Sequence, residues 1–280
     1  MAMTGSEIAK GGFSNEEEVA NKFNNWKTDL DAQRWLKIMM YDLEEILDVK
    51  AEKIGQRGFK SDINVAISIF ITKKLKQSEI TTVENIQVKL VSGKSGFNQV
   101  EKRKVSQYIK QWHLTPNLIR LLKHYDGEIP PYKPGRHEKR MFVDEFSQEE
   151  QLELMNYFQS HIVMIVSDVI RGRGRFAAEW TLVINKYQGN YNWVLISINE
   201  AIQFYLGDCK VNFTKTGNIH LGNITLQRKG GDGGADSANM LQFKSDPMIL
   251  FNKETLPYSN LSEENRENEM VCFEQKGKIS

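Results

Sequence analysis

The chain of 280 residues is poor in cysteine, in paired histidine ligands and in long apolar runs. Its two cysteines, Cys209 and Cys272, form neither a disulfide framework nor a metal-ligand spacing, which favours a reducing, cytoplasmic compartment. The five histidines show no paired spacing, so zinc chemistry is not indicated. No apolar run approaches the roughly 18 residues of a membrane span, and the first residues resemble neither a signal core nor a transit peptide. We therefore expect a cytoplasmic globular protein with no membrane partner.

The charge is nearly balanced overall but unevenly distributed along the chain. Formal net charge is +1, with 40% hydrophobic and 26% charged residues, an ordinary globular composition. Residues 1–50 hold 6 Lys/Arg against 10 Asp/Glu, a net of −4, whereas residues 89–140 hold 12 against 4, a net of +8. Such asymmetry lets a near-neutral protein present one basic face to a polyanion. Solvated helix faces produce the same counts, so charge alone leaves both interpretations open.

Hydrophobic periodicity predicts an α/β (α+β) protein. The pattern favours helices early in the chain, then a strand pair, further helices and a strand-rich end. A long helix is expected from Ser147, with Glu150 completing a capping box. The remaining predictions are helices over residues 15–26, 31–49, 100–112 and 117–125, and strands over 64–72, 85–92, 179–187, 192–198, 218–229 and 240–244.

Two apolar runs carry charges that call for a reason. Asp62 opens the first strand, and Gln87 and Lys89 stand two apart on the second, so both point to one face while Val88 offers its carbonyl. A phosphodiester is hydrolysed through a transition state that cations stabilise, and Mg²⁺ prefers oxygen ligands. The set is sensible as a metal-nuclease centre. By itself the pattern is weak, since both charges could equally reach solvent at strand ends.

Longer motifs are far more specific. The segments "GFSNEEEVANKF", "SDINV", "NIQVKLVS", "GFNQVEK", "KRMFVDEFSQEEQ", "RGRGRFAAEW" and "TLQRKGGDGGADSANMLQFK" occur in this order over about residues 7–252. In them the chain closely resembles the small type II restriction endonucleases of the PD-(D/E)xK superfamily. The nearest branch cuts GCGC, and a more distant one cuts CCGG.

The resemblance implies a fold and an activity. It implies a PD-(D/E)xK core, a central mixed sheet flanked by helices, with a C-terminal strand-rich DNA-recognition part. Residues 1–252 would form a single domain, with the catalytic core over about 1–145, recognition over about 146–252, and a polar tail over 253–280. It also implies Mg²⁺-dependent hydrolysis of double-stranded DNA, with Mn²⁺ as a substitute ion. A cognate DNA methyltransferase would act on the same site.

Catalytic roles carry over onto matching positions, with two departures. Asp62 would be the main metal ligand, assisted by Gln87 and the Val88 carbonyl, while Lys89 would orient the attacking water. Ser61 replaces the motif's proline, and Gln87 replaces its second acid, which weakens one metal site. Glu16 is our candidate for a compensating acid. Alternatively, the three acids at 16–18 simply favour a helix N-terminus.

Candidate DNA contacts follow from the chemistry of a G·C target. Guanine offers acceptors to Arg or Lys, and cytosine offers a donor to an acid. The stretch "QRKGGD" holds both kinds of group, although a solvated surface hairpin would look the same. The arginines of "RGRGRF" could bind phosphates or cap the preceding helix. The candidates are Asn98, Gln99, Lys102, Arg171, Arg173, Gln227, Arg228, Lys229, Asp232, Gln242 and Lys244.

Two rival functions remain open at this stage. A structure-selective repair or junction nuclease with the same core would cut at branches or nicks regardless of sequence. A DNA-binding protein with a decayed centre, as Gln87 could suggest, would bind specifically without cutting. The retained Asp62 and Lys89 argue against decay.

Overall fold

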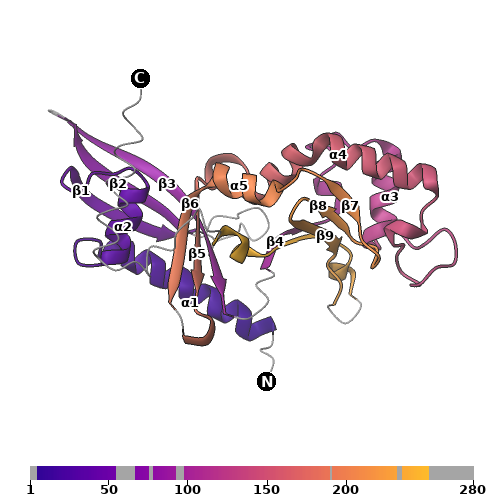
Figure 1. The fold of residues 1–280 in the computed structure, drawn as a ribbon, viewed down its shortest axis with the longest axis horizontal. Helices are drawn as coiled ribbons and strands as arrows, with labels where there is room; N and C mark the ends of the chain where they lie inside the picture. Colours follow the sequence, from indigo (N-terminus) through magenta and orange to yellow (C-terminus); the bar gives the residue numbers. More distant parts are fainter. Residues whose placement is uncertain are drawn as a thin grey trace.

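The computed structural model describes residues 5–54, 67–75, 78–92, 98–189, 191–231 and 235–251. Its strands form two five-stranded sheets, which occupy the two halves of an elongated molecule (Figure 1). No helix in these ranges is long and apolar enough to cross a membrane.

The first sheet is mixed, as the resemblance implies. Its order is β1 (Ile46–Lys53), β2 (Ile67–Leu75), β3 (Ser78–Val91), β5 (Trp180–Asn185) and β6 (Asn192–Ser197). The β3–β5 pair is parallel, and the other pairs are antiparallel. Helices α1 (Gly5–Asn24) and α2 (Leu30–Ile38) pack on one face, where apolar side chains of alternating strand residues meet them.

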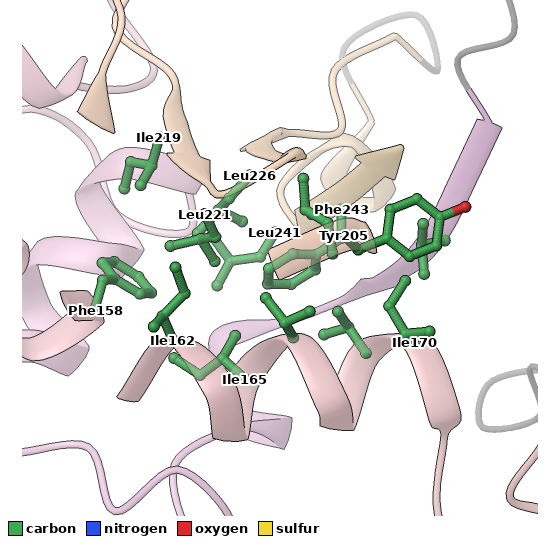
Figure 2. Close-up of a cluster of buried hydrophobic side chains, with 14 of the residues drawn as sticks. Phe158, Ile162, Ile165, Ile170, Tyr205, Ile219, Leu221, Leu226, Leu241 and Phe243 are labelled. Atoms are coloured by element: carbon green, nitrogen blue, oxygen red, sulfur yellow. The ribbon is translucent and has the colours of Figure 1, made fainter. Parts of the chain in front are cut away.

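The second sheet is antiparallel throughout its described strands. Its order is β4 (Asn98–Arg103), β10 (Leu241–Ser245), β9 (Ile224–Arg228), β8 (Ile219–Leu221) and β7 (Val211–Phe213). Figure 2 shows Phe158, Ile162 and Ile165 of α4 (Gln148–Arg171) packed against Leu226 and Phe243 from the sheet. Helices α3 (Pro116–Asp126) and α5 (Ile198–Leu206) complete this core. One face of the second sheet is therefore apolar and covered.

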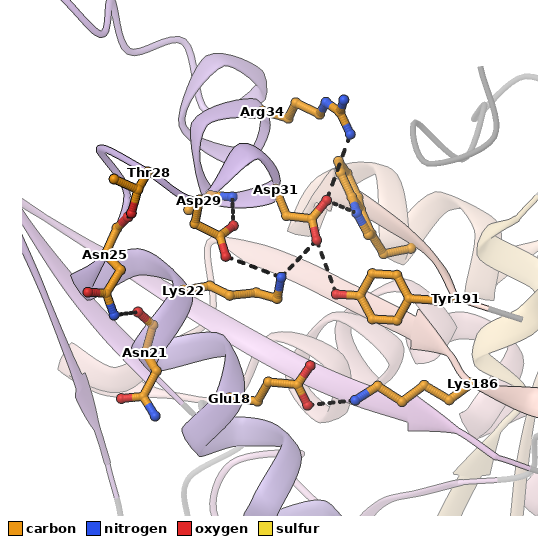
Figure 3. A network of polar contacts seen from close by, with 12 residues as sticks. Glu18, Asn21, Lys22, Asn25, Thr28, Asp29, Asp31, Arg34, Lys186 and Tyr191 are labelled. Atoms are coloured by element: carbon orange, nitrogen blue, oxygen red, sulfur yellow. Dashed lines mark hydrogen bonds and ion pairs between the residues drawn. The ribbon is translucent and has the colours of Figure 1, made fainter. Parts of the chain in front are cut away.

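Ion pairs fix α1 to its surroundings (Figure 3). Lys22 Nζ lies 3.3 Å from Asp29 and 2.9 Å from Asp31, whose carboxylate also accepts a 3.0 Å hydrogen bond from Trp193 on β6. One turn earlier, Glu18 pairs with Lys186 at 2.6 Å. These contacts hold the C-terminal turns of α1 at a defined position against the sheet.

The predicted helix over residues 31–49 is wrong in its second half. Helix α2 ends at Ile38, because Met40 adopts a left-handed φ of 66°, and β1 begins at Ile46. Ile46 and Val49 are both buried and three residues apart, so they fit a helical pattern as well as this twisted edge strand. Pairing with β2 decides between the two conformations.

The predicted helix over residues 100–112 is also wrong. Residues Asn98–Arg103 form strand β4, and only a short 3₁₀ turn, Val105–Gln107, follows. Glu101 and Arg103 point inward and pair with one another, so charges that look solvated in the sequence are buried. Buried charges hide the period-2 pattern from a reading based on hydrophobicity.

Other expectations are confirmed. Ser147 caps α4, with Glu150 completing the capping box. The β2–β3 hairpin extends as far as the Leu75–Ser78 pair, beyond the predicted strand boundaries at residues 72 and 85. The two sheets interleave along the chain: β5 and β6, beyond residue 145, join the first sheet, while β4 joins the second.

Candidate active site

Strand β3 presents the predicted catalytic pair on one face. Gln87 and Lys89 lie opposite Thr181 and Val183 of the parallel neighbour β5. Val88, between them, packs on the other side with the core beneath α1 and α2. The side chains of Gln87 and Lys89 thus point away from that core, and they share the face that the two-residue spacing predicts.

This face holds polar atoms that lack partners within the described residues. Gln87 is only 2% exposed and its Nε2 has no hydrogen-bond partner there; the neighbouring Thr181 is 1% exposed with an equally unpartnered Oγ1. A buried polar group without a partner costs about 1–3 kcal/mol. The unpaired groups of Gln87 on β3 and Thr181 on β5 are therefore available to a ligand.

Lys89 is only partly exposed, and burial lowers the pKa of its ammonium group to about 8. The carboxylate of Glu16 acts in the opposite direction, which places it within electrostatic reach of Lys89. Glu16 Oε2 also pairs with Lys53 Nζ of β1 at 2.9 Å. The chosen acid of α1 is thus paired with β1 and acts on the lysine of β3 through its charge, a long-range relation that local sequence could not reveal.

The helix-terminus explanation for Glu16 does not hold. Helix α1 begins at Gly5, so residues 16–18 lie well inside it and not in its first turn. Asn15, the first residue of the predicted helix, is 3% exposed with both amide atoms unpartnered within the described residues. A dipole preference confined to the first turn cannot account for these acids.

The candidate ligand atoms near Lys89 are of the kind that a hard cation binds. The Gln87 amide, the Val88 carbonyl and the Glu16 carboxylate offer oxygen, the element that Mg²⁺ prefers. Within the described residues no three His, Cys, Asp or Glu side chains gather to hold a metal. Asp62, the expected main ligand, lies outside the described residues, as does Asp232.

The open face of the second sheet gathers five predicted DNA contacts from three strands. Gln242 of β10 donates from Nε2 to Gln99 Oε1 of β4 at 2.8 Å, and its Oε1 accepts from Gln227 Nε2 of β9 at 3.1 Å. Lys102 and Lys244 share this face, because they pair across the strands with Gln242 and Gln99. We call Gln99, Gln242 and Gln227 the glutamine row. It presents a fixed line of amides flanked by two lysines.

Arg228 lies on the opposite face from its neighbour Gln227. Its Nε donates to the Asp126 carbonyl at 2.9 Å and its Nη2 to Asn239 Oδ1 at 2.6 Å. Lys229 continues the strand pairing through its backbone, with its N–H donating to the Met240 carbonyl at 2.9 Å. Asn98, at the start of β4, pairs in register with the buried Ser245. The structure does not bring these three side chains into the glutamine row.

The two candidate arginines at the C-terminal end of α4, Arg171 and Arg173, differ in their surroundings. Arg173 forms an ion pair with Asp168 and lies 4.0 Å from Glu101 of β4, whereas Arg171 is exposed at the last residue of the helix. Trp112 adds a 2.8 Å hydrogen bond to Asp168. Burial raises the pKa of Glu101 to about 7, although the adjacent arginines oppose this shift. Arg173 thus ties the end of α4 to the strand that carries Gln99.

Comparisons with known proteins identify the family. Residues 39–251 match the model of the R.HinP1I restriction endonuclease family, a range that begins after Glu16. The fold is similar to the crystal structure of restriction endonuclease MspI in complex with its cognate DNA, with a TM-score of 0.58 and 12% identity. That similarity covers 82% of this chain and 87% of the MspI chain. No curated protein matches the sequence. Because the family model covers well over half of the chain, this protein belongs to the R.HinP1I restriction endonuclease family and is a type II restriction endonuclease that cuts DNA.

Proposed function

We propose that this endonuclease hydrolyses double-stranded DNA at a short GC palindrome, GCGC, in a Mg²⁺-dependent reaction. One observation carries the proposal: β3 presents Gln87 and Lys89 on one face, with unpartnered buried polar atoms beside them. The resemblance of the long sequence motifs to GCGC-cutting enzymes supports the target. A cytoplasmic location and a methyltransferase that protects the same site complete the proposal.

The residues of the first sheet divide the chemical work. Lys89 holds the attacking water in line with the phosphorus and offsets negative charge on the pentavalent transition state. With a pKa lowered to about 8, the ammonium group is still mostly charged at neutral pH, and it gives up its proton more readily than an exposed lysine does. Gln87, the Val88 carbonyl, Asp62 and Glu16 would hold the ion. Bound Mg²⁺ would supply polarisation of the phosphoryl oxygens and acidification of the water.

The glutamine row and its lysines are proposed to read the bases. Gln242 uses its amide N–H to bond Gln99 and its C=O to bond Gln227. The two outer glutamines, Gln99 and Gln227, therefore each keep one amide group for DNA. In the orientation shown, Gln99 keeps a donor for a guanine acceptor, and Gln227 keeps an acceptor for the cytosine amino group. Lys102 and Lys244 add positive charge along the row.

Digestion of a fully sequenced plasmid, with Mg²⁺ and with EDTA, tests the proposal when the fragment ends are sequenced. We expect discrete ends at GCGC with Mg²⁺, similar ends with Mn²⁺, and none with EDTA. Ends at another sequence would replace the target and keep the chemistry. Cutting that follows nicks or branches would overturn sequence recognition. Specific binding without any cutting would make the centre a relic.

A further inference from the structure

The loop that follows α3 carries two arginines with opposite electrostatic surroundings. Both stack on Phe142: the guanidinium carbon of Arg136 lies 4.2 Å from the ring centroid and that of Arg140 lies 3.9 Å from it. Arg136 forms ion pairs with Asp144 and with Glu145, so its charge is balanced. Arg140 is partly buried and pairs with no carboxylate in the described part of the chain. Its stacked guanidinium donates no hydrogen bond to the described residues, so its N–H donors are available there.

A second guanidinium, that of Arg228, acts electrostatically on Arg140 and forms no ion pair with a carboxylate of the described residues. Burial lowers the pKa of Arg140, and the charges of Arg228 and Arg136 lower it further, while Tyr125 and Glu145 act in the opposite direction. Among the described residues, Arg228 donates only to neutral acceptors, the Asp126 carbonyl oxygen and the Asn239 side chain. The Asp126 carboxyl is fully buried, and burial raises its pKa, which weakens it as a counter-charge. Two like charges that pair with no carboxylate of the described residues favour an anion between them.

Close backbone packing puts this pair beside the connection between β9 and β10. Gly127 ends α3 with a φ of 88°, and a Cβ there would lie 3.0 Å from the Lys139 carbonyl oxygen. The same Cβ would lie 3.1 Å from Asn239 Oδ1 and 3.2 Å from Arg228 Nε. The loop before Arg140 is thus pressed against the start and end of that connection, which carries the predicted base readers Lys229 and Asp232.

We infer that Arg140 and Arg228 form an anion site that takes a backbone phosphate of the DNA. The inference rests on the proposed function, since it assumes that the β9–β10 connection approaches the duplex. Phosphate contacts fix register without specifying sequence, and the planar guanidinium fork of arginine can donate two parallel hydrogen bonds to a phosphate. Arg140 is a contact that the sequence motifs did not single out, and Arg228 contributes here to positioning on the backbone.

Equilibrium binding to labelled duplexes in EDTA tests the inference without cleavage. One duplex carries GCGC and a second carries the same bases scrambled, each titrated over a series of salt concentrations. Arg140→Met, which keeps the apolar stem, should weaken binding to both duplexes about ten-fold. The slope of log affinity against log salt should fall by about 1. Arg136→Met, on the same ring but already paired, is the matched control and should leave the slope unchanged.

Further variants separate charge from folding. Arg140→Lys should retain most of the wild-type salt slope, and a double Arg140→Met/Arg228→Met variant should lose less than the product of the single losses. An unchanged slope in Arg140→Met, or a loss confined to the GCGC duplex, would overturn the phosphate assignment. Should Arg140→Met fail to fold, Arg140→Lys with a reduced slope would overturn it too. Wild-type protein that binds both duplexes equally would refute base reading and still leave the salt slope as a test of Arg140.

Discussion

The polar side chains around Gln87 and Lys89 on the first sheet and those of the glutamine row on the second sheet differ in how far their hydrogen bonds are satisfied. On the first sheet, Gln87 and Thr181 are buried with atoms that lack partners within the described residues, and Lys89 is partly buried with a pKa lowered to about 8. On the second sheet, Gln99 and Gln242 satisfy one another on an open face. The face of β3 that carries Gln87 and Lys89 holds groups in an environment that disfavours them, whereas the glutamine row holds groups that are already paired.

This difference matches the two tasks that we propose for the two sheets, cleavage and base reading. Chemistry at phosphorus gains from charges placed in a site of low dielectric constant, where they act strongly on the transition state. Base reading gains from amides whose rotamers are fixed before DNA arrives, because less side-chain entropy is lost on binding. The first sheet therefore gives up stability for reactivity, and the second uses internal hydrogen bonds for order.

The largest expected effect separates cleavage from binding. Lys89→Ala should lower the cleavage rate by at least about 100- to 1,000-fold, because a charge that acts on the transition state is lost. Affinity for the GCGC duplex in EDTA should change by less than about three-fold. Single-turnover cleavage and equilibrium binding measure the two quantities. Lys74→Ala, an exposed lysine on the same hairpin, is the control, and near-normal cleavage by Lys89→Ala would remove Lys89 from the active site.

A second prediction concerns the stability that Lys89 costs the first sheet. Lys89→Met should raise the free energy of unfolding at pH 7 by on the order of 2 kcal/mol, because a desolvated charge disappears. Since the pKa falls from 10.5 to about 8, the unfolded chain holds this proton more tightly, and wild-type stability rises as pH passes through that window. The advantage of the variant should thus be full below pH 8 and vanish above about 10.5.

Urea unfolding of both proteins at several pH values gives this difference directly. Conversion of Lys74 to Met changes the same atoms on an exposed surface and should leave stability almost unchanged at every pH. A Lys89→Met variant less stable than wild type at pH 7 would mean that the ammonium is stabilised in the fold, against the contrast between the sheets.

Sequence reading went furthest where the signal is local. The capping box at Ser147, the alternation through β5 and the shared face of Gln87 and Lys89 all depend on residues within a few positions of each other. It failed over residues 31–49, where only pairing with β2 distinguishes strand from helix. It failed again at β4, whose charged residues are buried through long-range partners.

The site followed the same division. Residue types and their spacing identified Gln87 and Lys89, and the resemblance brought in Glu16 and the row of candidate DNA contacts. Neither showed that Glu16 pairs with Lys53 of β1, that three distant glutamines bond in a line, or that Arg140 pairs with no carboxylate of the described residues. Each of these depends on which strands become neighbours, and strand order cannot be derived from a single sequence.

The smallest expected effect concerns the glutamine row of the second sheet. Gln242→Leu removes both hydrogen bonds of the glutamine row and leaves Gln99 and Gln227 free to rotate. Discrimination between the GCGC and scrambled duplexes should fall roughly ten-fold, a loss of about 1–2 kcal/mol, while affinity for the scrambled duplex stays nearly constant. Asn212→Ala, an exposed change on β7 of the same sheet, should leave both affinities unchanged. An equal loss on both duplexes would show that the row holds the sheet together without reading bases, and recognition would then have to come from the β9–β10 connection.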